Sequence, residues 1–258
     1  MTLLCLRDVC TAPWGTSLLR GINFDLGAGK ILGLVGPNGA GKTSLLNTLV
    51  GDIPLQAGSL LLAGRPLANW PRRELAQTLA YLPQLSLLNF PYTVEEVILL
   101  GRSPHDTGAA CDRAILEEVL HLTDTLALRS RLYTQLSGGE KQRVQLARIF
   151  SQIWQESLVG KMLLLDEPTA ALDIQHQQSI ALAIRQLAAR GCAIVLVIHD
   201  FNAVSALADQ VIALKNGRQM AYGKPGEVFT EKMFQELFDA DVVVAKHPSR
   251  DQTLIIPR

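Results

Sequence analysis

The chain has 258 residues, of which 48% are hydrophobic and 19% are charged. This composition is typical of a globular protein with a sizeable core, in one large or two small domains. Its 24 basic residues balance 24 acidic ones, so no overall field attracts nucleic acid or an anionic membrane surface, and we expect no nucleic-acid partner.

The four cysteines are scattered, and no pair has the C-x-x-C spacing of a metal site: Cys5, Cys10, Cys111 and Cys192. They predict buried or idle thiols in a reducing compartment. No apolar run reaches the roughly 20 residues that span a bilayer, and Arg7 and Asp8 interrupt the stretch that a signal peptide would keep apolar. We therefore expect a cytoplasmic chain, which a partner would have to hold at any membrane.

Glycines and prolines separate short apolar runs in the first 70 residues, at Pro13, Gly15, Gly21, Gly27, Gly29, Gly58 and Gly64. This pattern is typical of hairpins and predicts a small antiparallel sheet flanking the core. Residues 31–35 differ, because they are apolar on both faces and predict a buried strand.

The segment after this strand fits the phosphate-binding pattern G-x-x-x-x-G-K-[ST], with Gly36, Pro37, Asn38, Gly39, Ala40, Gly41, Lys42 and Thr43. It opens a predicted helix over residues 42–50, which ends at Gly51. Glycines let backbone N–H groups turn toward phosphate oxygens, and the helix N-terminus adds a positive dipole end. We expect Lys42 to reach the outer phosphates, Thr43 to hold Mg²⁺ and Ser44 to lie near the inner phosphates. A purposeless Gly-rich turn would not need this strand–loop–helix context.

Residues 93–136 contain no strong strand, and the periodic stretch over residues 112–122 predicts a helix. We interpret this segment as a helical insertion. It is followed by Leu136, Ser137, Gly138, Gly139 and Glu140, which open a predicted helix over residues 140–153. Ser137 and Glu140 have capping-box spacing. Capping does not need two adjacent glycines, so we expect Gly138 and Gly139 to let a phosphate approach the helix N-terminus, as a second anion site.

Two further apolar runs, residues 162–165 and 193–198, predict buried strands with polar residues at their carboxyl ends. Asp166 is the candidate ligand of the Mg²⁺ shell, and Glu167 is the candidate general base for an attacking water. Pro168 ends the first of these strands. His199 follows the second, where a neutral imidazole could bond the γ-phosphate; a purely structural histidine is the alternative. A helix is predicted over residues 174–189, before Gly191.

The alternation of strands and helices implies an α/β fold with a mostly parallel sheet. We predict a P-loop NTPase core over about residues 1–92 and 137–240, with a small antiparallel β subdomain, a helical insertion over about 93–136 and a C-terminal tail over about 241–258.

The phosphate cradle, Asp166–Glu167, residues 136–140 and the sequence Ala171, Leu172, Asp173 together resemble the ATP-binding cassette (ABC) ATPases over nearly the whole chain. The resemblance implies ATP and Mg²⁺ as cofactors. It implies that Gln84 contacts Mg²⁺, that Asp173 works across a dimer and that His199 is the switch histidine. Two copies would pack head to tail, with each ATP between one copy's cradle and the other's residues 137–139. Register places Pro13 where such proteins stack an aromatic residue on adenine. The neighbouring Trp14 is a candidate for this role, with a core or hairpin tryptophan as the alternative.

Three details resemble the ATPases of iron-chelate, haem and cobalamin importers: the sequence G-R-S-P-H over residues 101–105, the long connection over residues 149–161, and residues 173–177 with His247 and Pro248. The resemblance implies a homodimer that binds two transmembrane permease subunits and, indirectly, a periplasmic substrate-binding protein, at the cytoplasmic face of the bacterial inner membrane. Haem is the expected cargo, with cobalamin or a ferric siderophore as the alternative. His247 is not expected to bind haem, because a cytoplasmic motor subunit need not touch its cargo.

Two rivals come from other classes. Soluble cassette ATPases of DNA repair or translation usually carry two cassettes, zinc sites or long coiled coils, which this sequence lacks. A P-loop kinase or GTPase would leave residues 136–140 unexplained, and a guanine-specifying N-K-x-D motif is absent.

Overall fold

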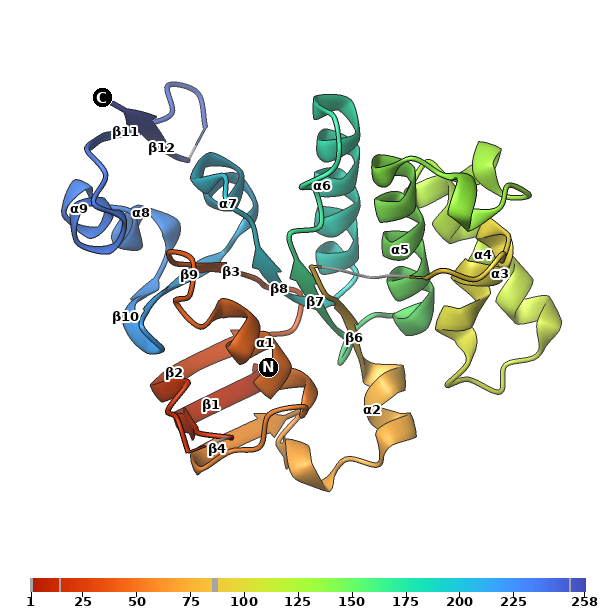
Figure 1. Ribbon diagram of the computed structural model, residues 1–258, viewed down its shortest axis with the longest axis horizontal. Helices are drawn as coiled ribbons and strands as arrows, with labels where there is room; N and C mark the ends of the chain where they lie inside the picture. Colours follow the sequence, from red (N-terminus) through yellow and green to blue (C-terminus); the bar gives the residue numbers. More distant parts are fainter. Residues whose placement is uncertain (1, 14, 85–87, 251) are drawn as a thin grey trace. The chain divides into compact units, whose positions relative to one another are not determined.

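The computed structural model describes residues 2–13, 15–84, 88–250 and 252–258. By its internal contacts the chain divides into two compact units. Unit 1 comprises residues 1–70 and 193–258, and unit 2 comprises residues 71–192. Figure 1 traces the elements of both units in chain order.

Unit 1 carries most of the strands. Its sheet runs in the order β5, β4, β1, β2, β10, β9, β3, β8. Their bounds are β1 Thr2–Thr11, β2 Leu19–Gly27, β3 Ile31–Val35, β4 Ala57–Leu62, β5 Arg65–Pro66, β8 Ala193–Val197, β9 Gln210–Lys215 and β10 Arg218–Gly223. Strand β1 pairs antiparallel with β2 and β4, which confirms the hairpins predicted for the first 70 residues. Strand β3 pairs parallel with both β8 and β9.

The helices of unit 1 are α1 Lys42–Val50, η1 Leu67–Asn69, α7 Phe201–Leu207, α8 Pro225–Val228 and α9 Glu231–Phe238. A separate antiparallel hairpin, β11 Val242–Lys246 and β12 Thr253–Pro257, ends the chain near α9 (Figure 1). Asn202 on α7 holds β12, because its side chain donates to the Ile255 carbonyl at 3.0 Å and accepts the Ile255 N–H at 2.8 Å. The hairpin is thereby tied to unit 1.

Unit 2 pairs two parallel strands, β6 Leu79–Leu82 and β7 Met162–Asp166. Its helices are α2 Arg72–Thr78, α3 Val94–Leu99, η2 Leu100–Arg102, α4 Ala109–Leu122, η3 Leu126–Leu128, η4 Tyr133–Gln135, α5 Gly138–Ile153 and α6 Ile174–Ala189. Helices α3, α4 and α5 pack on one another (Figure 1). The predicted helix over residues 112–122 is confirmed as part of α4, while the proposed limits of the helical insertion stay a prediction.

The α/β fold is confirmed, and the bounds of the predicted buried strands and helices agree with the structure to within three residues. Helix α5 begins at Gly138 rather than residue 140, because Ser137 is its N-cap and the first helical residue follows the cap. Gly51 ends α1 with a φ of 88°, and Gly191 follows α6 with a φ of 101°. Both angles lie in the left-handed region that glycine adopts without steric cost.

Buried strands form the centre of each unit. Every residue of β3, β7 and β8 is buried, as expected for strands that are apolar on both faces. A second apolar cluster surrounds Phe201, whose ring meets those of Phe229, Phe234 and Phe238 at centroid distances of 5.9, 4.8 and 4.9 Å. Edge-on aromatic contacts of this kind add to the burial of apolar area. The cluster fixes α8 and α9 to the remainder of unit 1.

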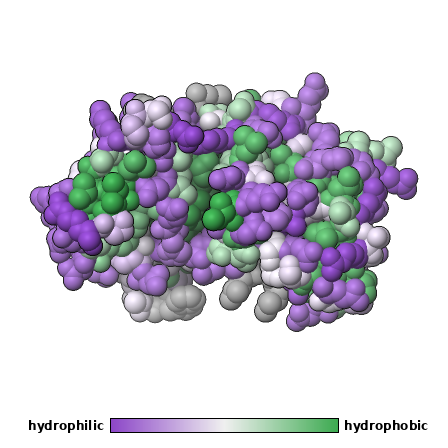
Figure 2. Space-filling view, turned by 90° about the horizontal axis from the view of Figure 1, so that it is seen from above, coloured by the Kyte–Doolittle hydropathy of each residue, from purple (hydrophilic) through white to green (hydrophobic). Residues whose placement is uncertain are grey.

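The surface is mixed. Figure 2 shows hydrophilic residues over much of the face it presents, with apolar residues in several separate groups. Within the described ranges, no helix is both long and apolar enough to cross a membrane. None of the four cysteines, which all lie in described parts of the chain, forms a disulfide; Cys192 is buried, Cys5 and Cys10 are half-buried and Cys111 is exposed. Burial raises the pKa of the Cys192 thiol, so that thiol is protonated and unreactive.

We expect Phe234→Ala to lower the free energy of unfolding by about 3–5 kcal/mol, because it empties a buried ring position in the aromatic cluster. Phe90→Ala is the matched control, since Phe90 is 63% exposed and its truncation should cost less than about 0.5 kcal/mol. Urea denaturation followed by circular dichroism measures both. A loss below about 1 kcal/mol for Phe234→Ala would contradict the assigned cluster.

Candidate nucleotide-binding and hydrolysis site

The phosphate cradle leaves β3 and winds tightly before α1. A side chain at Gly36 could not be accommodated, because a Cβ there would lie 2.3 Å from the Leu214 carbonyl oxygen. Gly39 and Gly41 have φ values of 75° and 104°, in the left-handed region. The loop is anchored by the Gly217 N–H, which donates to the Ala40 carbonyl at 2.9 Å. Glycines at these positions are therefore a requirement of the backbone, as the sequence predicted.

Lys42 and the start of α1 provide the positive groups of the cradle. The Lys42 ammonium donates to the Gly36 carbonyl at 2.8 Å and to the Pro37 carbonyl at 3.1 Å, so it lies against the loop. The N-cap of α1 is Gly41, which has no side chain to accept the first N–H groups, and the first turn carries no acidic residue. This helix start combines a fixed cation with backbone donors, which suits a phosphate.

His199 lies at the same edge of the sheet as the cradle. In the parallel pair of β3 and β8, Gly33 lies opposite Leu196. Gly36 follows Gly33 by three positions in the sequence, and His199 follows Leu196 by three. Parallel strands end at one edge, so the pairing brings this imidazole and the phosphate cradle to the same side of unit 1.

The carboxyl ends of β6 and β7 meet in the same way in unit 2. Leu82 lies opposite Leu165, and two residues beyond them stand Gln84 and Glu167. The Gln84 amide donates to Glu167 Oε1 at 3.0 Å. The structure therefore brings together the predicted glutamine and the predicted general base, which lie 83 residues apart in the sequence.

Glu167 has an unusual backbone. Its φ is 52°, in the left-handed region that costs a non-glycine residue roughly 1–2 kcal/mol. The turn is held by Gln142 on α5, whose amide donates to the Pro168 carbonyl at 3.1 Å and the Glu167 carbonyl at 3.4 Å. Asp166, the last residue of β7, is only 3% exposed. Non-glycine residues in this region concentrate at functional sites, and here the strained residue is the candidate base.

The predicted capping box at the start of α5 is confirmed. Ser137 Oγ accepts the Glu140 N–H at 3.3 Å, and Glu140 Oε2 accepts the Ser137 N–H at 2.7 Å. These bonds, aided by the Arg131 guanidinium, lower the pKa of Glu140. The glycines between them differ: the side-chain direction of Gly138 is open, whereas a Cβ on Gly139 would lie 3.0 Å from the Ala171 carbonyl oxygen. Gly139 therefore also allows close packing of residues 171–172 on α5.

Asp173 follows that packed segment and caps α6. Its Oδ1 accepts the backbone N–H of His176 at 2.9 Å. Bonds from the backbone and ring of His176 hold the pKa of Asp173 below its usual value, so the carboxylate is charged at neutral pH.

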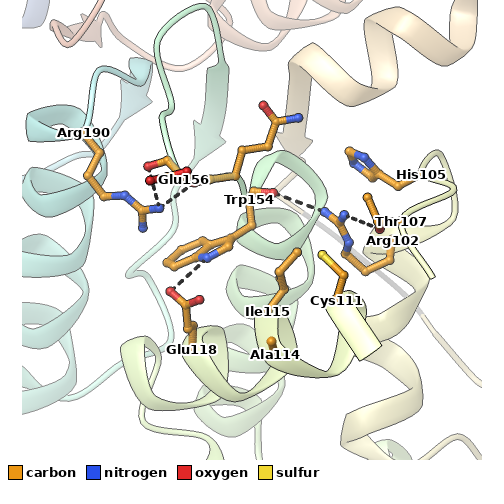
Figure 3. A pocket seen from close by; sticks show the side chains of 11 residues that line it. Arg102, His105, Thr107, Cys111, Ala114, Ile115, Glu118, Trp154, Glu156 and Arg190 are labelled. Carbon is orange, nitrogen blue, oxygen red and sulfur yellow. Dashed lines mark hydrogen bonds between the residues drawn. The ribbon is translucent and has the colours of Figure 1, made fainter. Parts of the chain in front are cut away.

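The G-R-S-P-H sequence and the long connection, singled out separately, lie in contact. Arg102 is 4% exposed and donates to the Ser151 carbonyl at 2.7 Å, and His105 bonds the Gln152 carbonyl at 2.7 Å, so both bind the last turn of α5. Burial lowers the pKa of His105. Figure 3 shows the Trp154 ring of the connection between Glu118 and Arg190, whose guanidinium lies 4.4 Å from the ring centroid. A pocket of about 500 Å³ lies beside these residues.

Some predicted residues have no place in these clusters. Trp14 lies outside the described residues, so its adenine-stacking role stays a prediction. His247 lies in the turn between β11 and β12, where its Nδ1 accepts the Ser249 N–H at 3.2 Å. Sequence reasoning missed Gln142 as the residue that holds the Glu167 turn. Its only signal is a polar residue two positions beyond the capping box.

Comparisons with known proteins agree with this site. The sequence pattern of the ABC transporter family matches residues 19–170, more than half of the chain. The hemin import ATP-binding protein HmuV of Pseudomonas entomophila is 46% identical over 243 residues, covering 94% of this chain and 95% of that protein. HmuV of Pseudomonas aeruginosa is 42% identical over 256 residues, covering 99% of this chain and 100% of that protein.

Solved structures show the same fold. The ATP-binding subunit of an ABC transporter superposes with a TM-score of 0.78 at 24% identity, covering 88% of this chain and 91% of that one. CbiO1 of Clostridium perfringens, part of the ABC transporter complex cbiONQ, has a TM-score of 0.75 at 25% identity, covering 91% of this chain and 93% of that one. The family pattern, the relatives and the fold agree: this chain belongs to the ABC transporter family.

Proposed function

We propose that this chain is the ATP-hydrolysing subunit of a bacterial ABC importer that carries haem. The observation that carries the hydrolytic role is the bond from Gln84 to Glu167, beside buried Asp166 at the ends of β6 and β7. A carboxylate that polarises an attacking water needs a partner that fixes its orientation, and Gln84 is that partner for Glu167.

The residues of the cradle fit the phosphates of ATP. Backbone N–H groups of residues 36 and 38–43 would face the phosphate oxygens, Lys42 would neutralise the outer phosphates, and Ser44 would lie near the inner ones. The Lys42 ammonium, held by two loop carbonyls, exchanges these neutral acceptors for charged phosphate oxygens when nucleotide binds.

Mg²⁺ is the proposed second cofactor, with Thr43, Asp166 and Gln84 as the residues that would hold it or its waters. The donor set fits, because Mg²⁺ takes oxygen ligands and needs only one or two protein carboxylates when nucleotide phosphates complete its shell. When bound, the ion would neutralise charge on the phosphates. A carboxylate at the buried position of Asp166 favours such a counter-charge.

Glu167 then acts as general base on the attacking water. Gln84 orients its carboxylate through the 3.0 Å hydrogen bond, and Gln142 holds the turn that carries it. His199 bonds the γ-phosphate from the edge at which β3 and β8 end. The left-handed φ of Glu167 aims its side chain away from the line of the strand, at the expense of local strain.

Each complete site needs a second copy of the chain. Residues 137–139 would bind the γ-phosphate of ATP held by the partner's cradle, and Asp173 would act across the same interface. Open space beside Gly138 at the start of α5 supports this role, since an anion can approach the helix N-terminus there. We expect the isolated chain to be monomeric without nucleotide and to hydrolyse ATP weakly.

A homodimer of this chain would join two transmembrane permease subunits at the cytoplasmic face of the inner membrane, with a periplasmic binding protein delivering the cargo. Exposed apolar residues follow Gln84 and support a docking surface there: Phe90 is 63% exposed, Tyr92 40% and Leu100 43%. Such a surface suits a short helix of the permease, which selects a partner and not a cargo.

The cargo assignment rests on relatives named for hemin import, which match this chain over almost their whole length. The cobalamin and ferric-siderophore alternatives draw no support from these relatives. The G-R-S-P-H sequence and the connection that it contacts, on which the resemblance to this importer group rests, lie outside the cradle.

We expect Glu167→Gln to lower turnover by roughly 10²- to 10⁴-fold while ATP still binds, because glutamine keeps the size of the side chain but cannot accept the water's proton. The variant should accumulate as a dimer with two bound ATP molecules. Steady-state hydrolysis and size-exclusion chromatography with ATP test both effects. Turnover within a few-fold of wild type would remove Glu167 as the base.

Mixing two inactive variants tests the dimer. Lys42→Ala should weaken nucleotide binding, and Ser137→Arg should block the partner's ATP site. In a mixed dimer one site pairs an intact cradle with an intact residue 137, so ATP binding should partly recover, as a fluorescent ATP analogue would report. Unaltered hydrolysis by Ser137→Arg alone would contradict the head-to-tail arrangement.

A strain that lacks this chain should fail to grow when haem is the sole iron source and grow normally on a ferric siderophore or with cobalamin as the limiting nutrient. Complementation with wild type, and its failure with Glu167→Gln, ties the defect to ATP hydrolysis. Normal growth on haem with failure on another nutrient would overturn the cargo and leave the ATPase mechanism intact.

A further inference from the structure

The start of α6 carries a histidine that the ATPase roles above leave unused. His176 lies one turn beyond Asp173, and its ring Nδ1 is 2.8 Å from Asp173 Oδ1. The same oxygen accepts the His176 backbone N–H at 2.9 Å. An ionised carboxylate oxygen only accepts, so Nδ1 carries the proton in this contact. Both the backbone and the ring of His176 therefore bond Oδ1 of Asp173.

The opposite edge of the ring faces a second carboxylate. His176 Nε2 is 3.5 Å from Oδ2 of Asp124, a residue in the turn after α4. That oxygen is also 3.1 Å from the Arg143 guanidinium on α5. The same guanidinium nitrogen donates to the Asp124 backbone carbonyl. Asp173, His176, Asp124 and Arg143 form one continuous chain of contacts, which we call the His176 relay.

The backbone of Asp124 places its carboxylate near both Arg143 and His176. Its φ is 51°, in the left-handed region that a glycine would adopt without steric cost. Aspartate is one of the few other residues that tolerate this conformation, and here it brings an anion between Arg143 and His176. The position thus combines a turn after α4 with an ion pair to Arg143 and a close approach to the His176 ring.

The contacts between the His176 ring and the two carboxylates contribute little to folding. The side chains of Asp173 and Asp124 are 65% and 74% exposed, and ion pairs of such exposure have small effects on stability. The N-cap of α6 also survives without the ring, because the backbone N–H of His176 still reaches Asp173. Loss of the imidazole therefore frees the orientation of the Asp173 carboxylate and leaves its capping bond in place.

We propose that His176 is a positioning residue, which fixes the Asp173 carboxylate relative to α5, the helix that opens at Ser137. The inference rests on the proposed role of Asp173 across the ATPase dimer. Residues 173–177 are part of the resemblance to this transporter group, and the proposal gives them a physical role. They hold the start of α6 in place relative to α5, the helix that presents residues 137–139.

Two substitutions separate the contacts of the ring. In His176→Asn the amide nitrogen replaces Nδ1 and keeps the bond to Asp173, whereas in His176→Gln it replaces Nε2 and keeps only the contact with Asp124. His176→Ala removes both. Gln175→Ala is the matched control, on the same exposed turn and outside the relay.

The test measures kcat and KM for Mg-ATP on the purified chains, at concentrations at which they pair, together with nucleotide affinity and Tm. We expect His176→Ala and His176→Gln to lower kcat about tenfold or more, since small misplacements of a site group have such effects. Nucleotide affinity and Tm should not change, because the cradle and the α6 cap are intact. His176→Asn should restore most of the rate, and Gln175→Ala should equal wild type.

Other results overturn the proposal. A His176→Ala rate within twofold of wild type removes the positioning role, and so does rescue by glutamine with failure of asparagine. An equal loss in all three variants with a lowered Tm makes the residue merely structural. A wild-type chain that does not hydrolyse ATP overturns the proposed function itself, which keeps the two failures distinct.

Discussion

Parallel pairing of neighbouring strands is the constraint on which the candidate site depends. In a parallel pair the carboxyl ends meet at one edge, so residues far apart in the sequence leave the sheet side by side. In unit 1 the pairing of β3 with β8 aligns Gly36 with His199. In unit 2 the pairing of β6 with β7 aligns Gln84 with Glu167, and their side chains bond. A slip by one residue would turn each of these groups to the opposite face.

Helix α5 holds several of these groups in place within unit 2. Its first turn is fixed by the capping box of Ser137, its middle holds the Glu167 turn through Gln142 and the Asp124 turn through Arg143, and its last turn is bound by Arg102. A helix of 16 residues is a rod of roughly 24 Å, so groups along it keep fixed separations. A shift of one end of α5 therefore also moves the groups that contact its other end.

Local patterns of the sequence were sufficient for β3, β7 and β8, for the helices α1, α4, α5 and α6, and for the cradle and capping box, because each depends on residues within one turn or one strand. The strands and helices after residue 198 were not predicted. The features of the site that were missed depend on contacts between distant segments. Nothing in the sequence indicates that Gln142 meets the turn 25 residues ahead, or that His176 meets Asp124. The left-handed φ of Glu167 was equally hidden, because glutamate does not favour it. The G-R-S-P-H sequence and the long connection were noticed separately, and only packing reveals that one binds the other.

The hydrogen bonds between Asn202 and β12 affect the tendency of the chain to aggregate in solution. Strands β11 and β12 are short and rich in valine, leucine and isoleucine, a composition prone to recruit further strands. An unprotected strand edge exposes a row of N–H and C=O groups to other chains. The Asn202 amide imitates a neighbouring strand by bonding both backbone groups of Ile255. The Asn202 side chain thus helps to protect the C-terminal hairpin against edge-to-edge aggregation.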